Sequence, residues 1–384
     1  MRFEFATATR IIFGAGCLKE VAPLVKGLGR KALVVTGRET KRAEPLIEML
    51  QGQGFGAVVC SVKGEPDLEI VEKGMQLAKQ SACDMVISFG GGSTIDAGKA
   101  IAAMLTNDGE LLDYLEVIGS GQALARPSAP FVAIPTTAGT GSEVTRNAVL
   151  ASPTHAVKVS LRSPHMLARI AVVDPELTYD LPAAITASTG LDALTQLIEP
   201  YVCARANPMT DGLCMEGIRR AARSLRTAVE DGKNAVARED MSVASLFGGL
   251  ALANAGLGAV HGFAGPIGGR FPAPHGAVCA ALLPHVMAIN LRALKQRQPK
   301  AEALRRYDEV GRLLTGSPTA GAEQGVAWVA QLVADLKIPR LRTYGITGQH
   351  APELVANSAK ASSMKANPIV LTEAELGEIL EAAI

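Results

Sequence analysis

The chain has 384 residues, a formal net charge of +1, and hydrophobic side chains at 48% of its positions. This length exceeds what one hydrophobic core usually holds, so we expect two domains. The near-neutral charge and the lack of long Lys or Arg runs argue against nucleic acid and anionic membrane surfaces as partners. We therefore expect a small-molecule substrate.

The six cysteines are scattered without a Cys-x-x-Cys pair, which is typical of reduced thiols in a cytoplasmic protein. The first residues, Met-Arg-Phe-Glu-Phe, contain an acidic side chain and no apolar export segment. No apolar run approaches the roughly 20 residues that a membrane helix requires. These patterns predict a cytoplasmic protein without a membrane partner.

The first half of the chain alternates predicted strands and helices. Runs of β-branched and apolar residues predict strands at residues 10–13, 32–36, 57–62, 84–89 and 131–135. Helical spacing of apolar residues predicts helices at residues 44–50, 69–81 and 93–104. Such alternation favours a parallel, doubly wound sheet, with residues 10–13 at its edge.

After Pro182 the pattern becomes helical. Helices are predicted at residues 184–203, 208–229, 239–255, 259–268 and 323–336. The sequence therefore predicts an α/β domain over residues 1–180 and a helical domain over residues 181–384.

A run of glycines, Gly90, Gly91 and Gly92, followed by Ser93, lies between a predicted buried strand and a predicted helix. Glycines let an anion approach the main chain, and the N–H groups at a helix N-terminus can bind phosphate. We expect Ser93 to cap the helix and to offer its hydroxyl. The alternative is a glycine-rich turn without a ligand.

A second polar cluster follows the predicted strand at residues 131–135, at the kind of position where open α/β sheets bind ligands. It reads Pro-Thr-Thr-Ala-Gly-Thr-Gly-Ser-Glu over residues 135–143. Its hydroxyl groups could bind phosphate and ribose, or they could cap a local turn.

These segments fit one known pattern when taken together. Residues 90–99 match G-G-G-S-x-x-D-x-x-K, and residues 135–143 match P-T-T-x-G-T-G-S-E. The later segments Gly-Leu-Asp-Ala-Leu-Thr-Gln at 190–196, Gly-Ala-Val-His-Gly at 258–262 and Phe-Pro-Ala-Pro-His-Gly at 271–276 continue it. The chain thus resembles the iron-containing (group III) alcohol dehydrogenase family, from residues 13–16 to Asn367-Pro368.

This resemblance implies a Rossmann-like, parallel-sheet N-terminal domain and an all-helical C-terminal domain, the dehydroquinate synthase-like architecture. Residues 1–180 would bind the dinucleotide, residues 181–384 would bind metal and substrate, and the active site would lie in the cleft between them. Relatives are often dimers or larger, so a homo-oligomer is expected.

By the same resemblance, the metal ligands are Asp192, His261, His275 and Gln196, which stands where the family has a His. The first three are also the expected catalytic residues, since a divalent ion on them would polarise an alcohol oxygen. Gln196 offers only a neutral carbonyl oxygen, a poorer ligand than imidazole for Fe²⁺ or Zn²⁺. The ion is therefore expected to be Fe²⁺ or Zn²⁺, bound weakly or absent.

The resemblance also assigns the cofactor residues. The phosphate side comprises Gly91, Gly92, Ser93 and Asp96. The nicotinamide side comprises Thr136, Thr137, Thr140 and Ser142. Lys158 is expected to reach the ribose.

Cofactor choice is predicted from the end of the first long strand. Relatives that prefer NAD carry an Asp at the position of Gly37, where a carboxylate would repel a 2′-phosphate. Gly37 removes that repulsion and Arg38 adds attraction, which favours NADP over NAD. Glu65, in the next strand-to-helix turn, could contact the adenosine ribose. The alternative is that Gly37 only turns the chain.

Three residues are candidate substrate contacts. Arg270 could bind a carboxylate or pack on the surface, and Asn147 and Phe263 are lesser candidates. The main hypothesis is a nicotinamide-dependent, metal-assisted alcohol dehydrogenase or aldehyde reductase. The alternatives are a maleylacetate-reductase-like, metal-independent oxo-acid reductase, a dehydroquinate-synthase-type lyase and a non-catalytic dinucleotide-binding protein.

Overall fold

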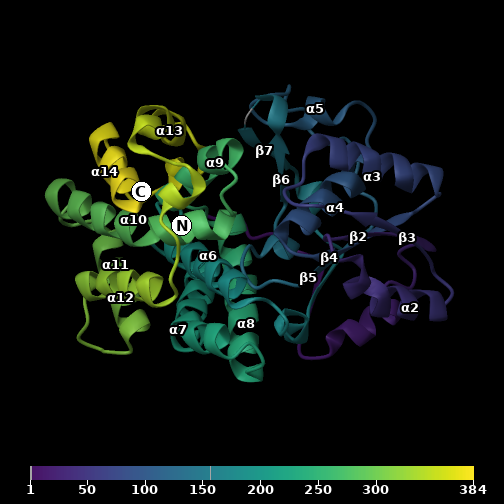
Figure 1. Cartoon of the computed structure of the whole chain (residues 1–384), viewed down its shortest axis with the longest axis horizontal. Coiled ribbons are helices and arrows are strands. Elements are labelled where there is room, and N and C mark those ends of the chain that lie inside the picture. The colour runs from purple at the N-terminus through teal and green to yellow at the C-terminus, as the bar shows by residue number, and fades with distance from the viewer. Residues whose placement is uncertain (1, 156) are drawn as a thin grey trace. The chain divides into compact units, whose positions relative to one another are not determined.

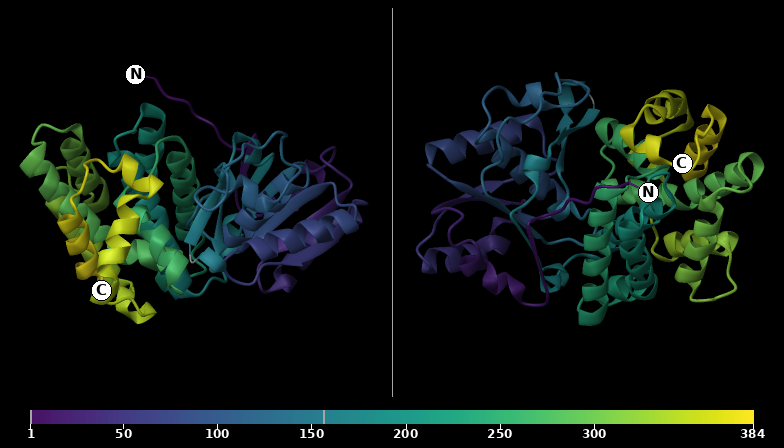
Figure 2. Two further views of the ribbon diagram at one scale, coloured as in Figure 1. Left: turned by 90° about the horizontal axis from the view of Figure 1, so that it is seen from above. Right: turned by 180° about the vertical axis from the view of Figure 1, so that it is seen from behind.

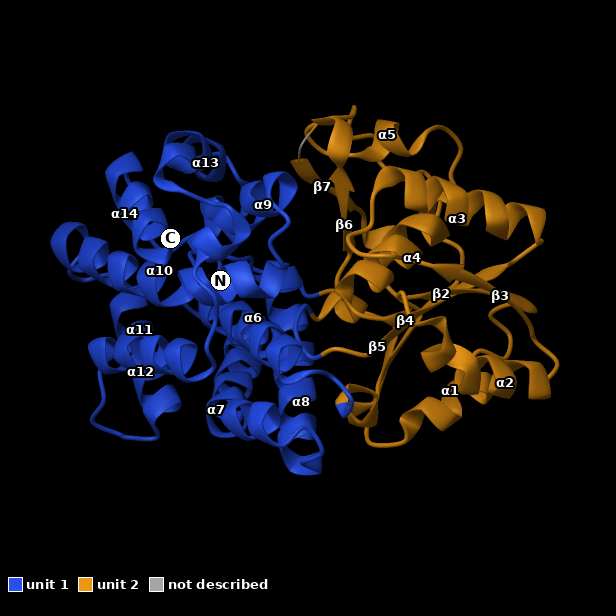
Figure 3. Cartoon of the chain, viewed as in Figure 1, with its two compact units in different colours: residues 1–5, 138–140, 179–384 blue, residues 6–137, 141–178 orange. Residues whose placement is uncertain are grey.

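The computed structural model describes residues 2–155 and 157–384 (Figure 1). The chain forms two compact units (Figure 3). Unit 2 comprises Ala6–Thr137 and Gly141–Thr178. Unit 1 comprises Met1–Phe5, Ala138–Thr140 and Tyr179–Ile384, so three residues of the predicted cofactor loop belong with the helical part of the chain.

Unit 2 is built on a parallel sheet. Its strands within the described residues are β1 (Arg10–Phe13), β2 (Lys31–Thr36), β3 (Gly56–Ser61), β4 (Met85–Gly90), β5 (Phe131–Pro135) and β8 (Ile170–Val173). Their order is β1-β8-β5-β4-β2-β3, and each paired strand is parallel to its neighbour. The chain passes from β3 to β4 across β2, which makes the junction of β2 and β4 a topological switch point. Ligands bind at such points in open α/β sheets.

Helices cover both faces of this sheet (Figure 1). They are α1 (Val21–Leu24), α2 (Glu44–Gly52), α3 (Leu68–Gln80), α4 (Gly92–Met104) and α5 (Leu111–Tyr114). Helices α1 and α2 bury apolar side chains against one face. Helix α4 packs against β4, β5 and β2, where a Cβ at Gly98 would lie 1.9 Å from Ser88 Oγ. Only glycine lets this helix approach so closely.

The antiparallel hairpin β6 (Asn147–Ser152) and β7 (Val157–Arg162) was not predicted from the sequence. Its first strand alternates buried and partly exposed residues, the pattern of a half-buried strand, but the run is short and contains Ala and Ser. The hairpin packs on α4 beside the polar loop that follows β5.

Unit 1 is helical (Figure 2). Its helices are α6 (Ala183–Val202), α7 (Pro208–Glu230), α8 (Ala235–Asn254), α9 (Ala259–Arg270), α10 (His275–Arg297), α11 (Glu302–Thr315), α12 (Ala322–Asp335), α13 (Ala351–Ala359) and α14 (Glu373–Ala383). The predicted combination of a parallel-sheet domain with a helical one is confirmed. Helix α8 begins four residues before its predicted start because Asn234 caps it, accepting a hydrogen bond from Ala237 N–H.

Helix α10 runs through the core of unit 1 and is long and apolar enough to cross a membrane. However, 78% of its apolar window is buried inside the structure. The bent pair of α8 and α9 passes the same test of length and composition when taken together. Buried core helices of soluble proteins share these properties, so the test is weak support for a membrane span.

Candidate active site and metal centre

Side chains from three helices of unit 1 converge on one point. Asp192 comes from α6, His261 from α9, and His275 and Cys279 from α10. One ligand atom from each of these four residues lies within 4.8 Å of the other three. Asp192 Oδ1 lies 3.4 Å from His261 Nε2 and 3.8 Å from His275 Nε2. The structure therefore brings the three predicted catalytic residues together, and adds a thiol that the sequence did not indicate.

Glu199 fixes the orientation of His261. Its Oε2 lies 2.6 Å from His261 Nδ1, and its Oε1 accepts a hydrogen bond from Val260 N–H at 2.7 Å. Both the glutamate and the imidazole are buried. Because Nδ1 is held by the carboxylate, Nε2 is the nitrogen that faces Asp192 and Cys279.

Helix periodicity explains the rest of the convergence. His275 is the first residue of α10 and Cys279 lies one turn later, so both side chains share a face. Asp192 and Gln196 have the same spacing on α6 and are both buried. Asp192 Oδ1 and Gln196 Oε1 both lack a hydrogen-bond partner among the described residues. A buried oxygen without a partner is costly, and a cation would satisfy it.

The charges of the cluster reinforce one another. Burial alone would lower the pKa of His275, but the Cys279 thiol and the Asp192 carboxylate raise it to about 9. The pKa of His261 is likewise raised well above its usual range, against burial, by Cys279, Asp192 and Glu199. Burial would raise the pKa of Asp192, but His275 and His261 hold it below its ordinary value. The cluster thus attracts positive charge.

The predicted phosphate cradle lies at the carboxyl end of β4. Helix α4 begins at Gly92, with Gly91 as its N-cap and no capping side chain. The prediction that Ser93 caps this helix is therefore wrong, since the glycines themselves make the turn. Thr136 N–H donates to Gly90 carbonyl oxygen at 3.0 Å, and a Cβ at Gly91 would lie 3.3 Å from Thr137 Oγ1. The N–H groups at the start of α4, which a helix leaves without intrahelical partners, and the predicted threonines that follow β5 thus lie side by side.

The side chains of Asp96 and Ser142 are hydrogen-bonded to each other. Ser142 Oγ donates to Asp96, and Val149 N–H donates to the same carboxylate at 3.0 Å. The buried Lys99 Nζ lies 3.3 Å from Asp96 and donates to the Ser142 carbonyl oxygen at 2.8 Å. This network fixes the loop after β5, so both residues position the loop. Thr140 lies in the segment Ala138–Thr140, which belongs to unit 1.

The residues predicted to choose the cofactor lie at the end of β2. Gly37 carbonyl oxygen accepts a hydrogen bond from Ser61 Oγ at 3.1 Å, and a Cβ at Gly37 would lie 3.8 Å from Thr94 Oγ1. Arg38 is exposed. Lys158 Nζ pairs with the half-exposed Glu65 at 3.1 Å, so these two predicted ribose contacts hold each other.

The candidate substrate residues have other partners. Arg270 is ion-paired with Glu353 on α13 and lies over the Phe271 ring, 5.7 Å from its centre. Phe263 is fully buried in the hydrophobic core of unit 1, where its side chain packs. Asn147 begins β6, and its carbonyl oxygen accepts from Lys99.

Three residues of these sites were missed from the sequence: Cys279, Glu199 and Lys99. The spacing from His275 to Cys279 matches that from Asp192 to Gln196, so the i, i+4 rule could have found the thiol. Lys99 is the last residue of the glycine motif at residues 90–99, so the motif could have indicated it. No local sequence pattern indicated Glu199, because its hydrogen-bond partner His261 lies 62 positions away in the chain.

Both halves of the chain match families of known proteins. Residues 8–175 match the family described as "Iron-containing alcohol dehydrogenase", and residues 186–384 match "Fe-containing alcohol dehydrogenase family, C-terminal". The 1,3-propanediol dehydrogenase of Klebsiella pneumoniae is 35% identical over 390 residues, covering 99% of this chain and 98% of its own. The NAD-dependent methanol dehydrogenase of Bacillus methanolicus is 33% identical over 380 residues, covering 97% of each.

The solved structures agree with the sequence comparisons. A crystal structure of a 1,3-propanediol oxidoreductase superposes with a TM-score of 0.93 at 34% identity, covering 100% of both chains. The family models match both the parallel-sheet unit and the helical unit that carries the ligand cluster. The chain therefore belongs to the iron-containing alcohol dehydrogenase family. It is an alcohol oxidoreductase of the group III type, and neither the oxo-acid reductase, the lyase nor the non-catalytic alternative is favoured.

Proposed function

We propose that the protein transfers hydride between a primary alcohol and NADP, assisted by a divalent ion in the cluster of Asp192, His261 and His275. The observation that carries the proposal is the buried, unpartnered Oδ1 of Asp192, aimed at two imidazoles. A carboxylate and imidazoles are a donor set that suits Fe²⁺ and Zn²⁺. The residues present therefore fit a metal ion.

Such an ion would supply Lewis acidity, lowering the pKa of the substrate hydroxyl. The residues of the chain would favour binding of this ion through charge and orientation. Asp192 brings the negative charge that favours a cation, and Glu199 holds His261 with Nε2 facing inward. Both oxygens of Glu199 are occupied by His261 and Val260 N–H, so it acts on the imidazole and not on the substrate.

The cofactor half of the proposal uses main-chain groups. The N–H groups at the start of α4, with Gly91 and Gly92, would bind the pyrophosphate, because a helix N-terminus attracts anions. Thr136 and Thr137 follow the adjacent strand and would contact the nicotinamide side. Lys99, Asp96 and Ser142 would keep that loop in place without touching the cofactor.

NADP is proposed over NAD because of the end of β2. No carboxylate stands at Gly37 to repel a 2′-phosphate, and the exposed guanidinium of Arg38 follows directly. NAD is the second candidate, since the methanol dehydrogenase relative is named for NAD.

The substrate is proposed to be a neutral primary alcohol, or the aldehyde made from it. The relatives named above act on methanol and 1,3-propanediol, which carry primary hydroxyl groups. An oxo-acid substrate would need a free cation, but the guanidinium of Arg270 already pairs with Glu353.

Steady-state turnover of 1,3-propanediol and methanol with NADP and with NAD tests this proposal. The metal-free protein and the protein loaded with Zn²⁺ or Fe²⁺ would be assayed side by side. We expect turnover that depends on the metal and a higher kcat/KM with NADP. Equal turnover in the metal-free protein would refute metal assistance, and a higher kcat/KM with NAD would refute the cofactor choice.

A further inference from the structure

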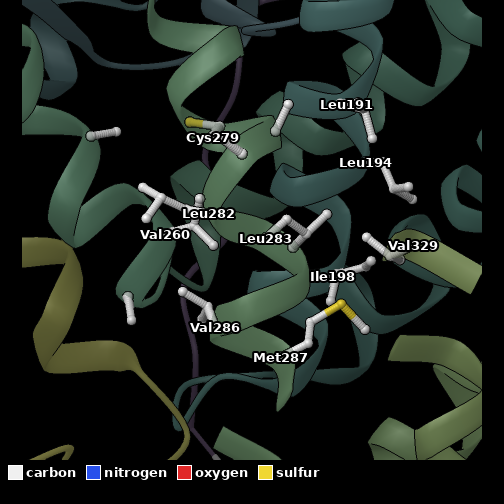
Figure 4. Close-up of a cluster of buried hydrophobic side chains, with 14 of the residues drawn as sticks. Leu191, Leu194, Ile198, Val260, Cys279, Leu282, Leu283, Val286, Met287 and Val329 are labelled. Carbon is white, nitrogen blue, oxygen red and sulfur yellow. The ribbon is translucent and has the colours of Figure 1, made fainter. Parts of the chain in front are cut away.

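Cys279 is placed where a fourth metal ligand would lie. It is fully buried on α10, one turn after His275, at one end of the apolar cluster of that helix (Figure 4). Its Sγ lies 3.6 Å from His275 Nε2 and 3.8 Å from His261 Nε2. Neither distance is that of a strong hydrogen bond. The thiol therefore lies close to both imidazoles without a strong hydrogen bond to either.

The distances match those between the ligands of one ion. Zinc bonds of about 2.0 Å to nitrogen or oxygen and about 2.3 Å to sulfur give tetrahedral ligand separations of roughly 3.3–3.8 Å. The separations of Asp192 Oδ1 from the two imidazole nitrogens are 3.4 and 3.8 Å, and those of Cys279 Sγ are 3.8 and 3.6 Å. The remaining pairs lie within 4.8 Å. Four of the six separations therefore match those between the ligands of one tetrahedral ion, and the other two are short enough for the donors to close around an ion.

An independent observation points to a cation inside this group. Asp192 is 1% exposed and its Oδ1 accepts no hydrogen bond from the residues that the structure describes, although it lies beside His261, His275 and Cys279. The cost of such an isolated oxygen is removed if a cation binds at the centre.

Two side chains compete for the fourth position. Gln196 Oε1 is buried and unpartnered as well, but a neutral amide oxygen is a weak ligand for zinc and iron. A thiolate is anionic and soft, and it favours Zn²⁺ over Fe²⁺. We infer that Cys279, and not Gln196, is the fourth ligand, so that the donor set of this chain is Asp192, His261, His275 and Cys279 and selects zinc over iron.

Binding breaks the S–H bond of Cys279 and forms a bond from Sγ to the ion. The proton leaves to solvent, and no oxidation state changes. The inference rests on metal binding at the site of the proposed function, but not on hydride transfer. Spectra of the metal-bound protein therefore test it even if no alcohol is turned over.

Titration of the full-length, metal-free protein with Co²⁺ is the first test. A thiolate ligand gives a cobalt–sulfur charge-transfer band in the near ultraviolet, which oxygen and nitrogen ligands do not give. We expect this band in the unmodified protein and in Gln196→Ala. Cys279→Ala should lose it and should lose more affinity than the roughly 10- to 100-fold that removal of an outer-shell partner costs.

Cys214→Ala is the matched control, because Cys214 is equally buried in unit 1 and lies outside the cluster. It should keep both the band and the affinity. A band that disappears in Gln196→Ala and persists in Cys279→Ala would overturn the inference.

X-ray absorption of the zinc-loaded, unmodified protein covers the case in which Cys279→Ala does not fold. We expect one sulfur neighbour at about 2.3 Å from zinc. A shell of oxygen and nitrogen alone would overturn the inference. Competition between Zn²⁺ and Fe²⁺ at equal concentration completes the test, since equal retention of the two ions would overturn the selectivity.

Discussion

The ligand cluster of unit 1 and the phosphate cradle of unit 2 are built by different means. In the cradle, the groups proposed to bind phosphate are main-chain N–H groups where β4 passes into α4, and side chains such as Asp96 and Lys99 hold the neighbouring loop. In the cluster, the binding groups are side chains from α6, α9 and α10. The proposed cradle therefore depends on glycine and backbone geometry, whereas one substitution in the cluster is expected to change its preference for an ion.

The largest effect is expected from Asp192→Asn, which tests the side-chain half of this comparison. Asparagine keeps the shape but removes the negative charge that favours a cation. Metal content after dialysis should fall to background, and turnover should fall on the order of 1,000-fold, because metal assistance is worth several kcal/mol. Asp308→Asn is the control, since Asp308 accepts a backbone hydrogen bond from Ala322 away from the cluster. Full metal occupancy in Asp192→Asn would remove this residue from the ligand set.

The scaffold of the cradle is tested by Lys99→Met. Lys99 is 1% exposed, faces the Asp96 carboxylate and donates to the Ser142 carbonyl oxygen, so its loss removes a buried cation together with its ion pair and hydrogen bond. We expect the free energy of unfolding to fall by roughly 3 kcal/mol, and cofactor affinity to fall as the loop loosens. In chemical denaturation, Lys158→Met should cost less, since its partner Glu65 is half exposed. Equal losses would show that burial does not decide the cost.

Glu143 lies in the same loop, and its buried carboxyl is expected to make the stability of the protein depend on pH. Burial raises the pKa of its carboxyl from 4.5 to about 7. A raised carboxyl pKa gives stability that is present below pH 4.5 and is lost as pH rises through 7. The unfolding free energy of the unmodified protein should therefore fall relative to Glu143→Gln by roughly 1.4 kcal/mol per pH unit in that window. Parallel pH profiles of the two proteins would contradict the expectation.

Glu199→Gln tests whether the cluster depends on a side chain that touches no metal. Glutamine keeps the size but weakens the hold on His261 Nδ1, so metal affinity should fall by roughly 10- to 100-fold. Cofactor affinity should not change, because the hydrogen-bond partners of the Glu199 carboxylate, Val260 and His261, both belong to unit 1. Glu309→Gln is the control, as this carboxylate binds Tyr201 Oη instead. Unchanged metal affinity in Glu199→Gln would contradict the positioning role.

The same contrast explains how much the sequence could predict. The glycine turn, five strands of the parallel sheet and helices α6 to α9 and α12 follow from local patterns, and their predicted ranges lie within a few residues of the observed ones. Strand β8 and helices α10, α11, α13 and α14 were not predicted. Asp192, His261 and His275 were found through motifs. Glu199 was not, because its hydrogen bond to His261 exists only after α6 and α9 pack. The hairpin of β6 and β7 was missed because its strands are short and weakly apolar.

The smallest effect is expected at Gly37, at the end of β2, where the lack of a carboxylate was predicted to favour NADP. A Cβ there would lie 3.8 Å from Thr94 Oγ1, an ordinary contact, so Gly37→Asp can be accommodated. A carboxylate near a 2′-phosphate costs about 1 kcal/mol in water at 4 Å, so the ratio of kcat/KM for NADP over NAD should fall roughly fivefold or more.

Gly37→Asn separates charge from size, because it adds the same bulk without a negative charge. It should leave the ratio of kcat/KM for NADP over NAD close to that of the unmodified protein. If Asn and Asp shift the ratio equally, space and not repulsion governs the choice at the end of β2. In that case Arg38 would be the remaining side chain at this strand end that can distinguish the two cofactors by charge.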